Sequence, residues 1–262
     1  MKKPVMLITG ASRGIGEAAA LLFSKDYHII LSSRTEKDLN LVKDRIISLG
    51  GSADILVSDF SSVESAVKTA EEMERKFGIP DTLVLNAGIS TNKDFENQTI
   101  DNMVLEMNVN YLSPMAFLKT VLPGMIERKS GNIITVGSVA SIIPFPGNST
   151  YAAGKSALLS MTLSLNMELK RFGIFAGCVL PGVTETDMTK AFHSVPFLPI
   201  SSPKEVAECI EETLRNKNEM GIPGTVNQIL TAVYKAAPGP IHFILKNSLE
   251  FILPEIQKRL QN

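Results

Sequence analysis

The pair Tyr151 and Lys155 is the part of this sequence best suited to moving a proton, because residues four apart on a helix share one face. A free tyrosine has a pKa of about 10, and a neighbouring ammonium group favours its phenolate, which brings the phenol toward useful acid–base range. Ser138, at the end of an apolar run, can donate a hydrogen bond to a substrate oxygen on which negative charge develops. By itself the Tyr-x-x-x-Lys spacing far more often marks a surface tyrosine beside a solvated lysine, so the rest of the sequence must decide.

A glycine-rich turn lies near the N-terminus, between an apolar run, Val5–Ile8, and a helical pattern, Glu17–Phe23. Glycine lets the backbone turn tightly and approach a pyrophosphate, whose charge sits against the free N–H groups at the start of a helix. The turn predicts a dinucleotide site, although such turns also arise as plain strand–helix connections. The residues of this turn that we expect at the cofactor are Gly10, Ser12, Arg13, Gly14, Ile15 and Gly16.

The end of the second expected strand indicates which dinucleotide is bound. NAD-binding folds usually place an acidic residue there, on the ribose 2′-hydroxyl. This chain has Ser33 and Arg34 instead, and Arg13 lies in the glycine-rich turn. Because guanidinium groups bind a 2′-phosphate bidentately, we predict NADP(H) in preference to NAD(H), unless both arginines are ordinary surface charges. Asp59 is expected either to bond the adenine amine or to cap the helix that starts near Ser61.

Short apolar segments alternate with helical patterns over most of the chain, which is typical of a parallel sheet covered on both faces. We expect strands at Val5–Thr9, His28–Ser32, Ala53–Val57, Thr82–Leu85, Asn132–Val136 and Ile174–Leu180. We expect helices at Gly16–Ser24, Glu36–Leu49, Ser61–Phe77, Asn102–Arg128 (kinked or broken at Pro114 and Pro123), Tyr151–Arg171, Pro203–Asn216 and before Ala236. Right-handed crossovers make this a single doubly wound α/β domain of the Rossmann type.

Four segments with glycine or polar residues each directly follow an expected strand. They are the glycine-rich turn, Asn86-Ala87-Gly88, Ser138 and Pro181-Gly182. Since the carboxyl ends of parallel strands meet at one edge of a sheet, these segments converge on one site. Together with Tyr151 and Lys155, and in this order, they resemble the classical short-chain dehydrogenase/reductase family over roughly residues 4 to 190.

The resemblance implies roles for particular residues. Ser138, Tyr151 and Lys155 would be catalytic, and Tyr151 and Lys155 would also contact the cofactor, the lysine at its ribose. Asn110 would hold a water molecule in a proton relay to the lysine, with Asn108 as its rival for that role. The segment Asn86, Ala87 and Gly88 would form the floor of the cofactor site. The residues that would bind the nicotinamide carboxamide are Pro181, Gly182, Val183, Thr184 and Thr186.

The C-terminal part departs from the family pattern. Many soluble members end in a strand and a glycine-rich segment, where this chain has Gly221-Ile222-Pro223-Gly224 and then an apolar tail. We therefore divide the chain into a core (4–190), a flap over the site (191–216) and a divergent C-terminal segment (217–262). The flap favours a hydrophobic substrate, unless its apolar residues pack on the core; they are Phe192, Val195, Phe197, Leu198 and Ile200. The tail, 238–262, would pack on the core or a partner subunit, line a lid, or lie on a membrane surface.

Composition excludes several classes of function. A net charge of −1, from 26 basic and 27 acidic residues, argues against nucleic acid as a partner. Cys178 and Cys209 are too few for a disulfide framework, and we expect Cys178 to be a buried structural thiol. No apolar run approaches the roughly 18 residues of a spanning helix, and the first run is too short for a signal peptide. The histidines show no metal-ligand spacing, so we expect no metal. From the cysteine count and the short apolar runs we expect a cytoplasmic protein.

These observations predict an NADPH-dependent carbonyl reductase, reversible as a secondary-alcohol dehydrogenase, that acts on a small apolar carbonyl or alcohol. We expect a homo-oligomer. Two alternatives stay open. One is an NAD-linked alcohol dehydrogenase on the same fold, and the other is a non-catalytic NADPH-binding redox sensor.

Overall fold

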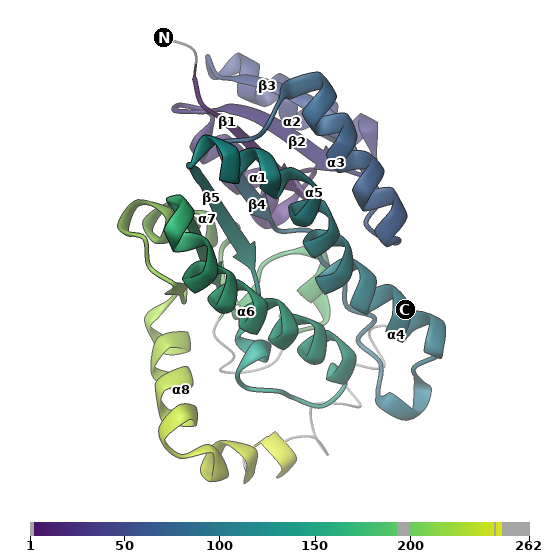
Figure 1. Ribbon diagram of the computed structural model, residues 1–262. Coiled ribbons are helices and arrows are strands. Elements are labelled where there is room, and N and C mark those ends of the chain that lie inside the picture. Colours follow the sequence, from purple (N-terminus) through teal and green to yellow (C-terminus); the bar gives the residue numbers. More distant parts are fainter. Residues whose placement is uncertain (1–2, 193–199, 244, 248–262) are drawn as a thin grey trace.

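The computed structural model describes residues 3–192, 200–243 and 245–247, which form a parallel sheet between two layers of helices (Figure 1). The seven strands run in the order β3-β2-β1-β4-β5-β6-β9 and all are parallel. Their bounds are β1 Val5–Thr9, β2 His28–Ser33, β3 Ser52–Val57, β4 Thr82–Leu85, β5 Gly131–Val136, β6 Ile174–Val179 and β9 Met220–Gly221. The predicted fold class is confirmed, and six of these strands lie within one residue of their predicted bounds.

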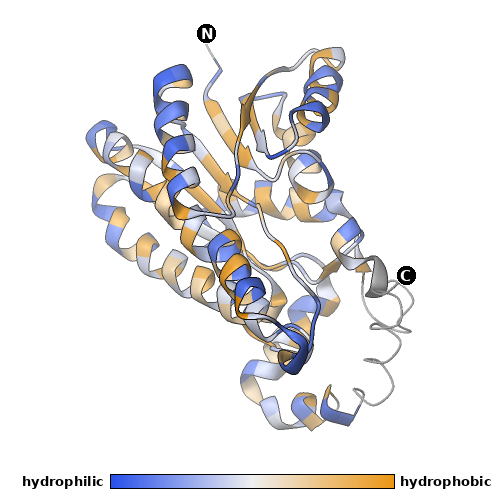
Figure 2. Ribbon diagram, turned by 90° about the vertical axis from the view of Figure 1, so that its right-hand side faces the viewer, coloured by the Kyte–Doolittle hydropathy of each residue, from blue (hydrophilic) through white to orange (hydrophobic). Residues whose placement is uncertain are grey.

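The central strands are apolar on both faces, as a sheet covered by helices on both sides requires. In β1, Met6, Leu7 and Ile8 are completely buried, and Leu7 is in register with Ile30 of β2 and Leu83 of β4. The strand order reverses between β1 and β4, so the loops after these two strands diverge and leave a crevice at their carboxyl ends. In Figure 2 the strands are mostly orange, whereas the helices alternate orange and blue.

Each face of the sheet has its own hydrophobic core and its own helices. One core includes residues of α1 (Gly14–Phe23), α2 (Glu36–Ser48) and α7 (Pro203–Asn216). The other includes residues of α3 (Val63–Phe77), α5 (Ser113–Arg128) and α6 (Ser149–Leu169). Burial of apolar side chains on both faces makes the largest favourable contribution to the stability of the sheet, and thereby positions the loops at its carboxyl edge.

The long middle helix is interrupted just before Pro114 and runs on through Pro123. The sequence predicted one helix over 102–128 with kinks or breaks at Pro114 and Pro123. In the structure α4, Ile100–Met107, passes through a π-helical turn, Asn108–Leu112, into α5. Pro114, which has no N–H to donate along the helix, lies in the first turn of α5, two residues after the π turn, and Pro123 lies within the helix. The apolar pattern of the sequence continues through the π turn, so the pattern could not predict the turn. Such turns are frequent at functional sites.

The C-terminal part differs from expectation in two ways. First, the short strand β9 joins β6, so the sheet has a seventh strand that two residues were too few to predict. Second, α8 (Thr225–Ala236) has an inverted pattern, with Asn227 and Thr231 buried. Its apolar side chains point outward, and in Figure 1 the helix extends away from the body of the molecule. The exposed apolar residues of α8 are Val226, Ile229, Leu230 and Val233.

A small second sheet joins the end of the core to the flap, because β7 (Val183–Thr184) pairs with β8 (Ile200–Ser201). The predicted apolar flap residues Val195, Phe197 and Leu198 lie outside the described residues, as does the tail from 248 onward. Within the described part of the chain, no helix is both long and apolar enough to cross a membrane.

Candidate active site

The glycine-rich turn has a backbone that only glycine accommodates. Gly10 and Gly14 have φ angles of +66° and +59°, in the left-handed region that side chains disfavour. A Cβ on Gly10 would lie 2.9 Å from the amide nitrogen of Asn86, and one on Gly16 would overlap the carbonyl oxygen of Gly10. The glycines therefore leave the backbone of this turn without side chains at the start of α1, as a pyrophosphate-binding turn requires.

The floor of this turn is held by Thr9, a residue that sequence reasoning missed. The Thr9 hydroxyl accepts hydrogen bonds from the backbone N–H groups of Asn86 (2.9 Å) and Ala87 (3.0 Å). In return the Asn86 amide donates to the carbonyl oxygens of Thr9 (2.9 Å) and Gly10 (3.3 Å). These bonds tie together the ends of β1 and β4, which are far apart in the sequence. The sequence does show a threonine as the last residue of the first strand, which could have suggested that its hydroxyl binds the neighbouring backbone.

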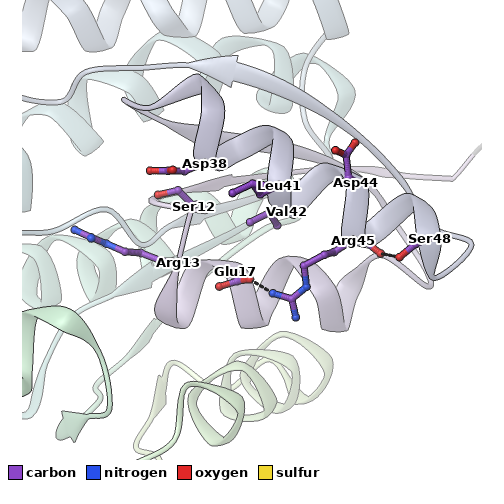
Figure 3. A pocket seen from close by; sticks show the side chains of 9 residues that line it. All are labelled: Ser12, Arg13, Glu17, Asp38, Leu41, Val42, Asp44, Arg45 and Ser48. Carbon is purple, nitrogen blue, oxygen red and sulfur yellow. Dashed lines mark hydrogen bonds and ion pairs between the residues drawn. The ribbon is translucent and has the colours of Figure 1, made fainter.

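A cavity of about 1110 Å³ runs along the carboxyl edge of the sheet and brings the predicted segments together. Of the predicted site residues, Gly16, Asn110 and Val183 are the ones that do not line it, and all others do. Beside it, between α1 and α2, lies a hollow of about 760 Å³ (Figure 3). Both are lined by Ser12, Arg13, Glu17, Asp38 and Arg45, of which Asp38 and Glu17 are acidic residues that were not predicted at the site.

The predicted cofactor-selecting residues lie at one end of the cavity. The buried hydroxyl of Ser33 has no hydrogen-bond partner within the described part of the protein, next to Arg34. Arg13 forms an ion pair of 2.9 Å with Asp187, across the cavity mouth, and both side chains are exposed. Asp59 accepts hydrogen bonds from the N–H and hydroxyl of Ser61, while the cap of α3 is Ser62. The alternative that Asp59 caps this helix is therefore wrong.

Ser138, Tyr151 and Lys155 meet at the other end of the cavity. Ser138 follows β5 and accepts a hydrogen bond from the N–H of Ala140 (3.1 Å), and its hydroxyl lies close enough to the phenol of Tyr151 to lower the pKa of that phenol. The Lys155 ammonium lies 5.8 Å from the centre of the Tyr151 ring, one turn along α6. The geometry thus places a hydroxyl, a phenol and an ammonium side by side, facing one space.

Burial moves the pKa values of the two titratable groups in opposite directions. Lys155 is 3% exposed, and this burial lowers its pKa to about 8, so that it is still mostly charged at pH 7. Its ammonium donates a 2.8 Å hydrogen bond to the carbonyl oxygen of Val136. Burial also raises the pKa of Tyr151, which the hydrogen bond from Ser138 partly offsets. Without a ligand, Tyr151 therefore keeps its proton.

Asn110 and Asn108, the two rivals for one role, point to different places. Asn110 is completely buried in the π turn, and its amide exchanges two hydrogen bonds with the backbone of Ile89, at 2.8 and 3.0 Å. A Cβ on Gly88 would touch both Asn110 and the Lys155 ammonium, so these groups flank the same glycine. Asn108 instead donates to the carbonyl oxygen of Ser61. The geometry favours Asn110 beside the lysine.

The helix α8 packs against the segment after β6, and this contact was not predicted from the sequence. The carbonyl oxygen of Pro181 accepts from the N–H of Val139 (2.8 Å) and from the Ser138 hydroxyl (3.4 Å). A Cβ on Gly182 would lie 2.6 Å from the side chain of Asn227, which is 4% exposed. Asn227 thus determines where the segment Pro181–Gly182 runs. Only long-range packing shows this, because Asn227 lies 45 residues further along the chain.

The two cysteines are poor candidates for chemistry. Cys178 is completely buried under the sheet edge, and burial raises the pKa of its thiol. That of Cys209 rises to about 11 for the same reason, so both thiols are unreactive at neutral pH. The residues that the structure describes contain no group of three or more side chains that could hold a metal ion.

Comparison with known proteins decides the family. A family model for short chain dehydrogenases matches residues 4–195. The chain belongs to the short-chain dehydrogenase family. It is accordingly an NAD(P)-dependent oxidoreductase that acts on alcohol or carbonyl groups, and the predicted resemblance is confirmed.

Similar members of the short-chain dehydrogenase family include ketoacyl reductases. The chain is 30% identical to the ketoacyl reductase HetN of Nostoc sp., over 92% of this chain and 88% of that one. It is 32% identical to the 3-oxoacyl-[acyl-carrier-protein] reductase FabG of Vibrio harveyi, over 79% and 87%. A short-chain dehydrogenase from Sphingobium yanoikuyae in complex with NADPH has a TM-score of 0.79 at 25% identity, covering 91% of this chain and 95% of that one. A gluconate 5-dehydrogenase from Burkholderia cenocepacia in complex with NADP and tartrate has a TM-score of 0.76 at 26% identity, covering 84% and 92%.

Proposed function

We propose that this protein is an NADPH-dependent carbonyl reductase, reversible as a secondary-alcohol dehydrogenase, that acts on an apolar carbonyl compound. One observation carries the proposal: Ser138, Tyr151 and Lys155 meet at one end of a cavity whose other end is the glycine-rich turn. One cavity shared by these three residues and the glycine-rich turn supports a proton donor and a hydrogen-bond donor acting beside a bound dinucleotide.

The chain's own residues handle the oxygen and the proton of the reaction. NADPH, when bound, supplies the hydride that reaches the carbonyl carbon. Ser138 donates a hydrogen bond to the carbonyl oxygen as negative charge builds there, and Tyr151 gives that oxygen its phenolic proton. Lys155 stabilises the resulting phenolate by its charge. Asn110, behind Gly88, supports a water-mediated path by which a proton returns to Tyr151.

Three groups support NADP(H) over NAD(H). The unpartnered hydroxyl of Ser33 and the side chain of Arg34 lie at the carboxyl end of β2, where the adenosine ribose is bound in this fold. Arg13, across the cavity, can add a second guanidinium once a phosphate competes with Asp187 for it. Asp38, one turn into α2, favours the opposite preference, so the balance rests on the two arginines and the serine.

The substrate class follows from the cavity and from the relatives. The lining of the cavity includes the apolar side chains of Leu105, Val109 and Met188, which suit an apolar chain next to a polar carbonyl. HetN and FabG are ketoacyl reductases by name, so we propose an oxoacyl or similarly lipid-like carbonyl. We further propose a cytoplasmic homo-oligomer. The two free thiols fit a reducing compartment, and the exposed apolar residues Ile100 and Val104 of α4 fit a subunit contact.

The test is oxidation of NADPH, followed by its nicotinamide absorbance, with acetoacetyl-coenzyme A, an oxo-sphingoid base and a steroid ketone as substrates. NADH is offered in parallel at the same concentration. Turnover with NADPH on at least one of these carbonyls supports the reductase. Faster turnover with NADH would support the NAD-linked alternative, and tight NADPH binding without any turnover would support the redox sensor.

A further inference from the structure

The side chain of Glu106, near the end of α4, is a buried carboxylate that the proposed reaction does not use. It is 2% exposed, and no ion pair to it exists among the described residues. Its oxygens accept hydrogen bonds from the N–H of Thr91 (2.5 Å) and from the side-chain amide of Gln98 (3.2 Å). Removing a carboxylate from water without a cation costs several kcal/mol, so a role other than stability would account for it.

The hydrogen bonds of Glu106 continue into the helix that carries Tyr151. Gln98, which donates to Glu106, accepts a 2.8 Å hydrogen bond from the hydroxyl of Thr150. Thr150 lies in the first turn of α6 and directly precedes Tyr151. The path from carboxylate to phenol therefore passes through one amide and one hydroxyl, all of them partly or fully buried.

A second hydrogen bond fastens the same two segments. The Ser90 hydroxyl donates to the side chain of Asn148 at 2.6 Å, and Asn148 is the residue at the N-terminal boundary of α6. The segment that follows β4 is thus attached to the start of α6 at Asn148 and at Thr150. Glu106 anchors that segment from the other side through Thr91.

We propose that Glu106 is a positioning residue, which fixes the first turn of α6, and with it the phenol of Tyr151, through Gln98 and Thr150. The inference rests on the proposed function in that Tyr151 is taken as the proton donor. The charge of Glu106 has a second consequence, because a nearby negative charge disfavours the phenolate and so raises the pKa of Tyr151. The groups that face Tyr151 are Ser138 and Glu106 from other elements and Lys155 from α6 itself.

The first test needs no substrate. Phenolate absorbance is titrated with pH in the full-length wild type and in Tyr151→Phe, and the difference isolates the ionisation of Tyr151. In Glu106→Gln this step moves to lower pH, because the negative charge is gone. Glu96→Gln, an exposed glutamate of the same segment, leaves the step in place. A step at the wild-type pH in Glu106→Gln, with wild-type circular dichroism, overturns the electrostatic part.

The second test separates position from charge. Gln98→Leu keeps the carboxylate of Glu106 but breaks the path to Thr150, and the same variant serves if Glu106→Gln does not fold. We expect kcat for NADPH-dependent reduction of acetoacetyl-coenzyme A, or of the panel carbonyl that the wild type reduces, to fall about tenfold, with the KM for NADPH unchanged. An unchanged kcat in Gln98→Leu overturns the positioning role. If Tyr151→Phe retains full activity, the proposed function fails, while the titration still reports whether Glu106 acts on Tyr151.

Discussion

The ammonium group of Lys155 lies 5.8 Å from the centre of the Tyr151 ring, and its hydrogen bond goes to the carbonyl oxygen of Val136. The lysine therefore acts on the phenol through its charge and not through a direct bond. Burial lowers the pKa of Lys155 to about 8, which means that burying its positive charge destabilises the folded protein. The same positive charge favours the phenolate of Tyr151. The same burial raises the pKa of Tyr151, so the pair is poised with the proton on the tyrosine and the charge on the lysine.

This relationship predicts that Lys155→Met stabilises the protein while it removes activity. The folded-state pKa of Lys155 is depressed, so the cost of its buried charge is fully present below pH 8 and disappears as the pH rises toward the unfolded value of 10.5. At pH 7 we expect a gain on the order of 1 to 3 kcal/mol, after allowing for the lost bond to Val136. The gain shrinks above pH 8.

Thermal and denaturant unfolding of wild type and Lys155→Met across this pH range measure it. Lys119→Met, which removes an exposed lysine, is the control and should change stability little at any pH. Lower stability of Lys155→Met at pH 7, or a difference independent of pH, would refute the argument.

The contact between Gly182 and Asn227 predicts a mutational rescue. Gly182→Ala places a methyl group 2.6 Å from the Asn227 side chain, so either α8 or the segment after β6 must move. We expect a loss of about 1 to 3 kcal/mol in unfolding free energy, as for other overpacked sites, and weaker NADPH binding. Asn227→Ala makes room for the methyl group, although it forfeits the hydrogen bond to Pro223.

The double variant should therefore lose less stability than the sum of the two single variants. Strict additivity would show that the two residues do not press on each other. Gly239→Ala is the matched control, because nothing lies within 4 Å of a Cβ at that position.

Arg34 offers a test of cofactor preference. Losing a charge-assisted hydrogen bond costs about 1.5 to 3 kcal/mol, so Arg34→Glu should weaken NADPH binding roughly tenfold to a hundredfold. Binding of NADH, which lacks the 2′-phosphate, should change little. Fluorescence titration with both nucleotides measures this, with Arg75→Glu, an exposed arginine of α3, as the charge-matched control. Equal weakening for both nucleotides would contradict the assignment of Arg34 to the 2′-phosphate.

The sequence was sufficient for six of the seven strands of the sheet and for the segments at its carboxyl edge. Strands such as Val5–Thr9 are short, continuously apolar and bounded by glycine or polar residues, which is how a doubly covered parallel strand must look. The segments that follow the strands then converge by topology alone. This is why Ser138, the glycine-rich turn and Asn86 could be assigned to one site before their distances were known.

What the sequence could not show depends on contacts between distant parts of the chain. Thr9 holds Asn86 across 77 residues, and Asn227 presses on Gly182 across 45. Glu106 looks like any polar residue of an amphipathic helix until the fold turns it inward. Polar residues carry no periodic signal that says which partner they will meet, whereas apolar residues do.

The central claim is that Tyr151 donates the proton, and Tyr151→Phe tests it most directly. The change removes one hydroxyl from a partly buried ring and leaves the cofactor-binding turn untouched. We predict that kcat for NADPH-dependent carbonyl reduction falls by about 10²- to 10⁴-fold, while the Kd for NADPH stays within about twofold. A Tyr151→Phe variant that reduces the same carbonyl at the wild-type rate would contradict the account.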